Sequence, residues 1–411
     1  MTAMAEPQRI VIVGAGLAGA TAAAAARAEG YDGELLLLGA EQHRPYELPA
    51  LSKGILLAER DEPDWVHDEN FYVRNGIDLR RGVEAVRIEL GARVVTDSHG
   101  GEHRFDRLLL ATGSRPRTVS VPGADLDGVR TLRTLDDALD LRASIEAARH
   151  VVIIGAGWIG CEAAAAARSL GAEVAVVDVR PLPLLDALGE EIARVFHQLH
   201  VEHGVQWRLG SGIAAITGEE SVTGVRLTDG TELPADLVLV AVGAAPRVEL
   251  ARAAGLEMAD DGGVTVDAGL RTAAPGVFAA GDIASHFHPR YGRRIRIEHW
   301  ANAKEQGEQA GKNLVGEPQP YEATPYFFTD QYDLGCEYRG LADPHSDELV
   351  VRGDLGARDF TAFWLRNGRV EAAMNVNQWD DGDALQAMVD KRVAVTADEL
   401  RTADLAELAQ R

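Results

Sequence analysis

Two glycine-rich segments of the chain have the residue types and spacing that bind a dinucleotide pyrophosphate. Residues 14–19 read Gly-Ala-Gly-Leu-Ala-Gly, and residues 155–160 read Gly-Ala-Gly-Trp-Ile-Gly, about 140 positions further on. In a G-x-G-x-x-G turn the first glycine allows the tight bend, the second lets a phosphate approach the backbone, and the third lets strand and helix pack closely. The helix that follows directs its first N–H groups at the negative charge. Both segments therefore predict the binding of a nucleotide cofactor.

An acidic residue follows each glycine-rich segment at the distance that a ribose contact requires. Glu41 and Asp178 each stand at or just after a second apolar run, about 20 positions beyond the glycines. A carboxylate there accepts hydrogen bonds from ribose hydroxyls and repels a 2′-phosphate, so Asp178 predicts NADH rather than NADPH. Two dinucleotide sites on one chain indicate a hydride relay between a held flavin and a visiting nicotinamide.

The elements that must position these residues are two copies of one strand–helix–strand motif. Residues 9–13 and 150–154 are mostly apolar runs, typical of strands buried on both faces of a parallel sheet. Each run leads into its glycine-rich turn, then into a helix of small residues, then into a second apolar run. Two further apolar runs end at Gly113 and Gly243, each where the chain could cross between two domains, and a short run ends at Asp282, whose carboxylate could lie near a ribityl or phosphate group.

The last part of the chain has a different pattern. Alternating segments and Asn367-Gly368, a strong hairpin signal, predict strands and hairpins followed by a polar helical segment. No glycine-rich phosphate loop occurs there. The predicted fold is therefore α/β, with two Rossmann-like dinucleotide-binding domains and a C-terminal α+β domain. The predicted boundaries are 1–114 with 247–322 for the FAD domain, 115–246 for the NAD domain and 323–411 for the C-terminal domain.

Composition excludes several other classes of protein. Of 411 residues, 41 are Lys or Arg and 64 are Asp or Glu, which gives a net charge of −23 and no general attraction for nucleic acid or an anionic membrane. No apolar run is long enough to span a bilayer, and residues 1–9 do not resemble a signal peptide. The two cysteines, Cys161 and Cys336, form no CxxC pair and predict neither a disulfide framework nor a metal site. We expect a cytoplasmic enzyme without a metal ion.

Five longer motifs are specific enough to indicate a family. They are RPYELPALSK at 44–53, ATGSRP at 111–116, AGD at 280–282, IEHW at 297–300 and FTDQY at 328–332. With them the whole chain resembles the FAD-dependent ferredoxin and rubredoxin reductases of bacterial oxygenase systems. The resemblance implies an NADH-dependent flavoprotein that passes single electrons to a ferredoxin of the [2Fe–2S] type, which in turn supplies an oxygenase.

The resemblance also implies roles for individual residues. Lys53 would reach the flavin edge, and Glu162 would point toward Lys53 near the flavin–nicotinamide stack, so these two are the candidate catalytic residues. Trp300 would lie against the flavin with its backbone N–H at the pyrimidine oxygen. The other expected FAD contacts are Gly14, Ala15, Gly16, Leu17, Ala18, Glu41, Arg44, Ala85, Thr112, Gly113, Arg115 and Asp282. The expected NADH contacts are Gly155, Gly157, Ile159, Gly160, Asp178 and Gly243.

A basic cluster lies between two of these expected flavin contacts. Arg290, Arg293, Arg294 and Arg296 fall between Asp282 and Trp300. Ferredoxins are typically acidic, and this chain is acidic as well, so attraction between them must come from a local patch. We take this cluster as the candidate docking site for the ferredoxin.

Two related functions remain as alternatives. The segment around Lys53 also resembles monodehydroascorbate reductase, which would use a small-molecule acceptor. A protein like apoptosis-inducing factor would use the same fold as a redox switch with nucleic acid as its partner, although the net charge of −23 argues against that. NADH oxidases and peroxidases of this superfamily are disfavoured, because they carry a redox cysteine where this chain has Lys53.

Overall fold

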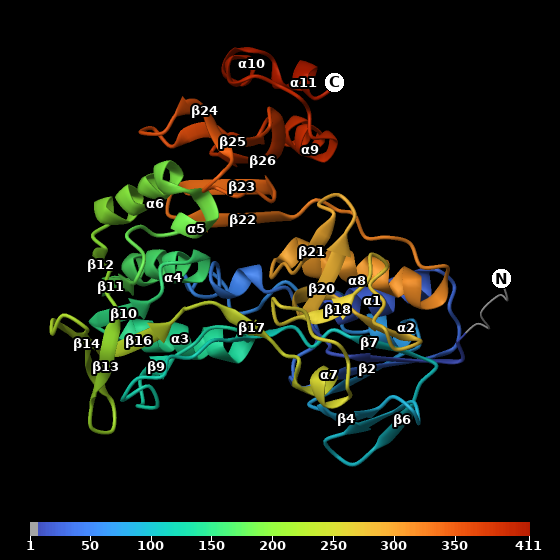
Figure 1. Cartoon of the computed structure of the whole chain (residues 1–411). Helices are drawn as coiled ribbons and strands as arrows, with labels where there is room; N and C mark the ends of the chain where they lie inside the picture. Colours follow the sequence, from blue (N-terminus) through green and yellow to red (C-terminus); the bar gives the residue numbers. More distant parts are fainter. Residues whose placement is uncertain (1–6) are drawn as a thin grey trace. The chain divides into compact units, whose positions relative to one another are not determined.

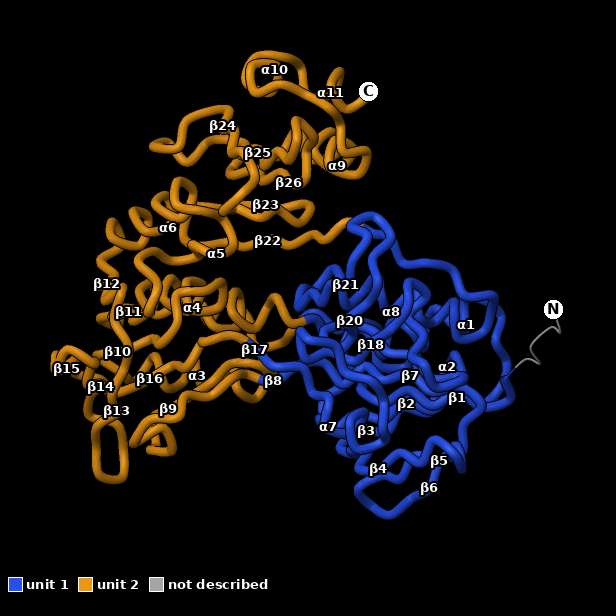
Figure 2. The backbone as a smooth tube through the Cα atoms, viewed as in Figure 1, with its two compact units in different colours: residues 1–47, 64–115, 244–323 blue, residues 48–63, 116–243, 324–411 orange. Residues whose placement is uncertain are grey.

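The computed structural model of the protein describes residues 7–411, which form two compact units (Figure 1). The segment before residue 7, part of the stretch in which we expect no signal peptide, lies outside the described residues. The first unit comprises the described residues up to 47 together with 64–115 and 244–323, and the second comprises 48–63, 116–243 and 324–411 (Figure 2). The three predicted domain boundaries stay a prediction.

The first unit is built on a parallel five-stranded sheet in the order β19-β7-β1-β2-β3. Four of these strands are short, mostly apolar runs with buried side chains, as the sequence predicts, whereas the edge strand β3 is mostly polar and exposed. Their bounds are β1 Arg9–Val13, β2 Glu34–Gly39, β3 Ile77–Arg81, β7 Arg107–Leu110 and β19 Val277–Ala279. Since all five strands are parallel, their carboxyl ends meet at one edge of the sheet, which is where ligands bind in such folds.

Two helices of the first unit pack unusually closely because the residues between them are small. They are α1 (Leu17–Ala28) and α8 (Trp300–Val315). A Cβ on Gly307 would lie 2.4 Å from the carbonyl oxygen of Ala18, and one on Gly311 would lie 2.3 Å from that of Ala22. Any larger residue at either glycine would push the helices apart, so these contacts fix the start of α8 relative to the first glycine-rich turn.

The second unit repeats the parallel arrangement in a sheet with the order β12-β11-β10-β16-β9. Its central strand β10 leads into the second glycine-rich turn and then into the alanine-rich helix α4. The bounds are β9 Val129–Arg130, β10 His150–Ile154, β11 Glu173–Asp178, β12 Gln206–Leu209, β16 Leu237–Val240, α3 Leu135–Ala147, α4 Trp158–Ser169, α5 Leu185–Leu188 and α6 Glu190–Glu202.

Residues 324–411 add an antiparallel sheet to the second unit, in the order β22-β23-β26-β25-β24. Asn367 and Gly368 both have positive φ, 54° and 70°, which is the type I′ turn predicted between β25 and β26. The bounds are β22 Tyr326–Gln331, β23 Leu334–Gly340, β24 Glu348–Asp354, β25 Asp359–Arg366, β26 Arg369–Val376, α9 Gly382–Lys391, α10 Ala397–Thr402 and α11 Leu405–Leu408. The fold class given by the sequence is thus confirmed.

One apolar core joins this sheet to the nucleotide-binding part of the second unit. Phe196 of α6 and Cys161 of α4 belong to the same buried cluster as Tyr338 and Trp364 of the C-terminal sheet. In Figure 1 the sheet accordingly lies beside α5 and α6. This shared core explains why both parts fall into one compact unit.

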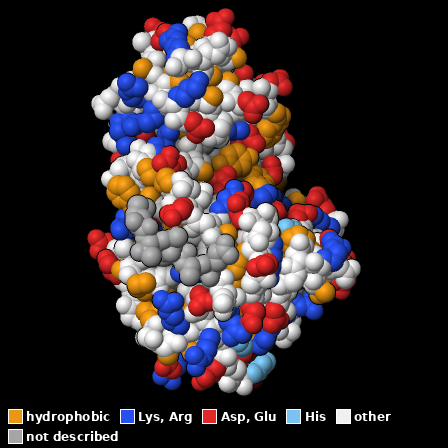
Figure 3. Space-filling model, turned by 90° about the vertical axis from the view of Figure 1, so that its right-hand side faces the viewer, with side chains coloured by type: hydrophobic (Ala, Val, Ile, Leu, Met, Phe, Trp, Pro, Cys, Tyr) orange, Lys and Arg blue, Asp and Glu red, His pale blue; other side chains and the backbone are white. Residues whose placement is uncertain are grey.

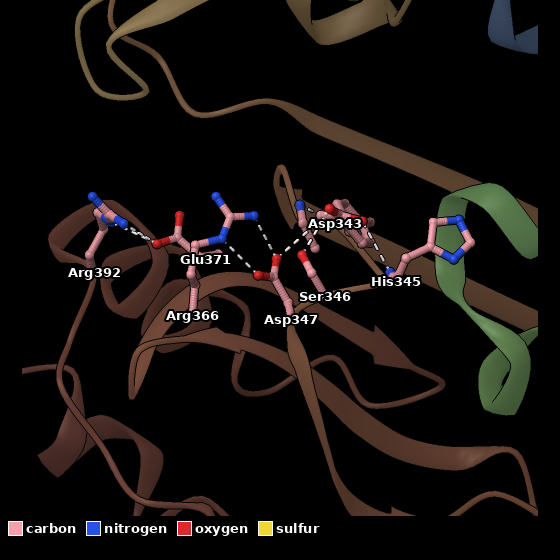
Figure 4. Close-up of polar contacts among 9 residues, drawn as sticks. Asp343, His345, Ser346, Asp347, Arg366, Glu371 and Arg392 are labelled. Atoms are coloured by element: carbon pink, nitrogen blue, oxygen red, sulfur yellow. Dashed lines mark hydrogen bonds and ion pairs between the residues drawn. The ribbon is translucent and has the colours of Figure 1, made fainter.

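Two buried carboxylates of the C-terminal part, Asp347 and Glu371, are each paired with an arginine (Figure 4). Asp347 accepts two hydrogen bonds from Arg366, at 2.7 and 2.8 Å, and a third from the N–H of Asp343 at 2.7 Å. Glu371 is paired with Arg392 at the end of α9. Buried carboxylates are stable only when paired in this way, so we assign this cluster a structural role.

Smaller elements complete the two units. In the first unit they are α2 Phe71–Arg74, β4 Ala85–Glu89, β5 Val94–Asp97, β6 Glu102–Arg104, β8 Ser114–Pro116, β17 Ala244–Pro246, α7 Glu249–Ala253, β18 Val264–Val266, η2 Gly281–Ile283, β20 Ala284–His288 and β21 Arg293–Ile295; β8 ends one residue beyond that unit. In the second they are η1 Pro49–Leu51, β13 Ile213–Gly218, β14 Val222–Leu227 and β15 Glu232–Pro234. Within residues 7–411 no helix is both long and apolar enough to cross a membrane.

Candidate functional site

The first glycine-rich turn connects β1 to α1 and has the form that a pyrophosphate requires. Gly14 has φ +108°, and a Cβ there would lie 2.1 Å from the carbonyl oxygen of Ala111. A Cβ on Gly19 would lie 1.9 Å from the oxygen of Gly14, so both glycines are required by the protein itself. Gly16 differs, because a Cβ there would meet no atom within 4 Å. The protein itself therefore does not require glycine at this position, and the open space beside its backbone suits the close approach of a pyrophosphate.

The second turn, between β10 and α4, reproduces this geometry. Gly155 has φ +110° and a Cβ there would lie 2.3 Å from the oxygen of Ala241, while one on Gly160 would lie 2.0 Å from the oxygen of Gly155. Gly157, like Gly16, has open space where its Cβ would be. In both helices the first intrahelical bond returns to this middle glycine, from Ala20 to Gly16 and from Cys161 to Gly157. The preceding N–H groups have no intrahelical acceptor and suit a phosphate.

Asp178 ends β11 beside the second turn, and its position is fixed by two hydrogen bonds. Its carboxylate accepts from the N–H of Ala156 at 2.7 Å and from the N–H of Arg180 at 2.8 Å. The side chain of Arg180 is itself held by Asp186 at 2.8 Å. Asp178 therefore braces the turn as well as presenting negative charge at the end of the strand.

Three apolar side chains are exposed around this second turn. Ile159 follows β10 and is 42% exposed, Val179 follows β11 and is 70% exposed, and Val242 follows β16 and is 36% exposed. They follow the carboxyl ends of three adjacent strands, next to Gly243, and exposed apolar side chains grouped in this way suit the flat faces of a nucleotide. Val179 and Val242 were not predicted as site residues, although Val179 directly follows β11 and Val242 lies two positions after β16.

The residues expected at the adenosine end of FAD lie in the first unit, where each contacts an aromatic side chain. Glu41 accepts a hydrogen bond from the hydroxyl of Tyr46 at 2.6 Å. The guanidinium carbon of Arg44 lies 4.2 Å from the centre of the Trp65 ring. Sequence reasoning missed Tyr46 and Trp65 because their role depends on the pairing of residue 46 with residue 65, which no local pattern records.

The expected flavin contacts Asp282 and Trp300 also lie in the first unit. Asp282 is buried in η2, and the preceding N–H of Gly281 donates to the side-chain oxygen of Gln306 at 2.9 Å. Trp300 opens α8, so its N–H lies in the first turn, where helical N–H groups have no intrahelical acceptor. Its indole N–H donates to Glu47 at 2.9 Å. This geometry fits the expected contact between the Trp300 N–H and a carbonyl oxygen of FAD.

The other four expected FAD contacts also lie in the first unit. Thr112 donates from its hydroxyl to the oxygen of Arg247 at 2.6 Å, and Gly113 takes a positive φ of 65°. Arg115 is exposed and paired with Glu249 of α7, rather than standing free for a phosphate. Ala85 is buried at the start of β4.

Lys53 and Glu162, the candidate catalytic residues, meet inside the second unit. The Lys53 Nζ lies 2.7 Å from Glu162 Oε1, and the Glu162 side chain is 5% exposed. Glu162 also accepts from the hydroxyls of Ser52 and Thr329, the latter at 2.6 Å. Sequence reasoning predicted the Lys53–Glu162 contact from resemblance alone and did not find the two hydroxyl partners.

Neither cysteine has the environment of a redox thiol. Cys161 and Cys336 are both buried and free, and burial raises the pKa of each thiol well above its usual range. The reactive form of cysteine is the thiolate, which this burial disfavours. Electrons from a bound flavin have no thiol to pass through at either position.

The arginines of the basic cluster are in different environments. Arg294 donates to the backbone oxygens of Val266 and Ser285, and Arg296 is paired with Glu298 and donates to the oxygen of Asp282. Arg293 is exposed on β21, and the guanidinium of Arg290 lies over the ring of Tyr291. Part of the cluster is therefore structural. On the face drawn in Figure 3, acidic and basic side chains are interspersed, so any electrostatic attraction there is local.

The fold and the two turns define a class of protein: an oxidoreductase with one site for each of two dinucleotides. Residues 8–307 match the family described as pyridine nucleotide-disulphide oxidoreductases, and residues 326–409 match the reductase C-terminal domain. The chain belongs to the pyridine nucleotide-disulphide oxidoreductase family. FAD and NADH are its cofactors, as the sequence predicts.

Relatives of the chain narrow this class. It is 40% identical to the ferredoxin–NAD(+) reductase component of the anthranilate 1,2-dioxygenase system of Burkholderia cepacia, over 92% of this chain and 93% of that one. It is 37% identical to the corresponding component of the biphenyl dioxygenase system of Paraburkholderia xenovorans, over 95% of each chain. The predicted resemblance to ferredoxin reductases is confirmed.

Solved structures give the same result. The ferredoxin reductase for the CYP199A2 system of Rhodopseudomonas palustris superimposes with a TM-score of 0.94 at 36% identity, over 98% of this chain and all of that one. The reductase in the covalent putidaredoxin reductase–putidaredoxin complex superimposes with a TM-score of 0.92 at 33% identity, over 98% of both chains.

Proposed function

We propose that this protein oxidises NADH with a held FAD and passes the electrons singly to a [2Fe–2S] ferredoxin that supplies an oxygenase. The observation that carries the proposal is the pair of matched turns, in which Gly16 and Gly157 each leave open space beside the backbone at the start of a helix. The names of the relatives, which are ferredoxin reductase components of dioxygenase systems, support the choice of acceptor.

In this proposal FAD is held by the first unit. The Gly14–Ala18 backbone would bind the pyrophosphate, Glu41 and Arg44 the adenosine end, and Asp282 and Trp300 the flavin end. Ala85, Thr112 and Gly113 would complete the contacts, and Arg115 would join them by exchanging its pair with Glu249 for the cofactor. When bound, FAD accepts a hydride from NADH and releases its electrons one at a time.

NADH would bind at the second turn, with Gly155, Gly157 and Gly160 at the pyrophosphate and Asp178 at the adenosine ribose. Ile159 and Gly243 would lie against the nucleotide. Because hydride passes directly between cofactors, the chain has to supply placement and charge rather than an acid or a base. Lys53, neutralised in part by Glu162, would place positive charge at the flavin edge.

The test of this function is a comparison of electron acceptors. With saturating NADH we expect kcat/KM for a [2Fe–2S] ferredoxin of an aromatic-ring dioxygenase system to exceed that for the monodehydroascorbate radical by at least about 100-fold, because only the former is recognised by a docking surface. A higher value for the radical would favour the monodehydroascorbate alternative. A gel shift of DNA at physiological salt would favour the nucleic-acid alternative.

The docking site is proposed at the basic cluster, and Arg293 is its most testable member because it is exposed. Arg293→Glu should raise the KM for the ferredoxin roughly three- to tenfold at low ionic strength, since an exposed charge acts mainly on association. Reduction of a small dye by NADH should not change. Arg87→Glu, at an exposed arginine of β4 in the same unit, is the control. An unchanged KM for Arg293→Glu would place docking elsewhere.

A further inference from the structure

The buried carboxylate of Glu162, on α4, is held by groups from two other parts of the second unit. Lys53 and Ser52 come from the segment 48–63, and Thr329 comes from β22, 167 positions away. A carboxylate so far from water needs donors of this kind to offset its loss of hydration. Thr329 belongs to the FTDQY motif, which is one of the motifs that indicate the family but for which the sequence predicts no functional role.

The hydrogen bonds continue beyond Thr329 in a single direction. The Thr329 hydroxyl has one hydrogen, which it donates to Glu162 Oε1 at 2.6 Å, so it can only accept from Gln331 Nε2 at 3.2 Å. The Gln331 amide therefore turns its oxygen to His200, whose Nε2 lies 2.9 Å away and must donate. Each donor in the series His200–Gln331–Thr329 points toward Glu162.

The local structure makes this series possible. Thr329 and Gln331 are two positions apart in β22, so both side chains leave the same face of the strand, and both are buried. The intervening Asp330 is exposed. His200 is fully buried on α6, and burial lowers its pKa to about 4 despite the bond to Gln331. His200 is thus neutral at pH 7 and holds its one ring hydrogen on Nε2.

We propose that Thr329 and Gln331 are positioning residues for the Lys53–Glu162 pair, with His200 fixing the direction of their hydrogen bonds. This role rests on the proposed function, in which that pair acts where NADH meets the flavin. Connected hydrogen bonds strengthen one another, and a carboxylate held from both sides keeps one orientation. The C-terminal sheet therefore contributes to the reductive half of the reaction, although none of the predicted site residues lies in it.

Matched variants of the FAD-loaded enzyme test the proposal by rapid mixing with NADH. Thr329→Val removes the hydroxyl with little change of shape and should slow flavin reduction about tenfold, because a hydrogen bond to a charged group is lost. Thr329→Ser keeps the hydroxyl and should stay within about threefold of wild type. Thr361→Val, which removes a buried threonine hydroxyl from β25 in the same sheet, should have no effect on the rate.

The Glu162→Gln variant distinguishes the role of the Lys53–Glu162 pair from the positioning role of Thr329. Thr329→Val should add nothing in that background, since the carboxylate it positions is gone. If Glu162→Gln itself leaves flavin reduction unchanged, the proposed role of the pair fails. If Glu162→Gln slows the reaction and Thr329→Val does not, the positioning role alone is overturned.

A second measurement tests the direction of the hydrogen bonds independently of catalysis, through the tautomer of His200. In protein carrying ¹⁵N-labelled histidine, His200, identified by the signal lost in His200→Gln, should be the neutral Nε2–H tautomer from pH 7 down to about pH 5. Gln331→Leu should alter that signal, because it removes the acceptor. An Nδ1–H tautomer, or a signal indifferent to Gln331→Leu, would overturn the proposal.

Discussion

Gly16→Val should give a folded protein that has lost FAD. A Cβ at Gly16 meets no atom within 4 Å, and its φ of −75° suits any residue, so the protein itself tolerates the change. The added side chain occupies the space proposed for the pyrophosphate. We expect FAD to bind at least about 100-fold more weakly, which corresponds to roughly 2.7 kcal/mol, and the purified protein to be colourless. Absorbance of the flavin and equilibrium binding of added FAD measure this directly.

The equivalent change in the second turn is the matched control. Gly157→Val should leave the protein yellow and raise the KM for NADH, because Gly157 stands in the other dinucleotide site. Gly14→Val and Gly19→Val should fail to fold, since their side chains would overlap backbone oxygens at 2.1 and 1.9 Å. A yellow Gly16→Val protein with unaltered FAD affinity would show that the pyrophosphate does not lie there.

Asp178→Asn should reduce the preference for NADH over NADPH. At about 4 Å, repulsion between a carboxylate and a 2′-phosphate is worth about 1 kcal/mol in water and about 4 kcal/mol at an intermediate dielectric. Wild-type selectivity in kcat/KM should therefore fall in the range of roughly 5- to 1,000-fold. Asparagine removes the charge and keeps one side-chain oxygen for the N–H of Ala156, while the hydrogen bond from the N–H of Arg180 is lost.

The ion pair between Arg180 and Asp186 provides a second variant for testing coenzyme selectivity. Arg180 is the nearest candidate to accept a 2′-phosphate, and Asp186 holds it at 2.8 Å. Asp178→Asn with Asp186→Ala should favour NADPH more than either change alone, while Asp186→Ala alone should stay selective for NADH. Equal kcat/KM values for the two coenzymes in the wild-type protein would refute the assignment of Asp178.

The parts of the site that are local in sequence could be predicted. Each glycine-rich turn is set by the chain's own close approaches, as at Gly14 and Gly155, and the apolar strand before it and the helix after it leave clear patterns. The Asn367-Gly368 hairpin was predictable for the same reason, because its two left-handed residues are required by the turn itself.

Contacts between distant segments could not be predicted in this way. Ser52 and Thr329 reach Glu162 across 110 and 167 positions, and a buried hydroxyl has no periodicity that marks its partner. The arginine cluster is a second case, since its spacing does not show that Arg294, although exposed, donates to backbone oxygens of neighbouring strands.

The central claim is that one flavin converts a two-electron donor into a one-electron donor without help from a thiol. The most direct test is an anaerobic titration of enzyme and excess oxidised [2Fe–2S] ferredoxin with NADH, following the ferredoxin spectrum. Since one hydride carries two electrons, each NADH should reduce two ferredoxins, both in the wild type and in the Cys161→Ser, Cys336→Ser double variant. The rates of ferredoxin reduction by the two proteins should be within several-fold of each other. A different ratio, or a loss beyond roughly 100-fold in a double variant that still holds FAD, would contradict the claim.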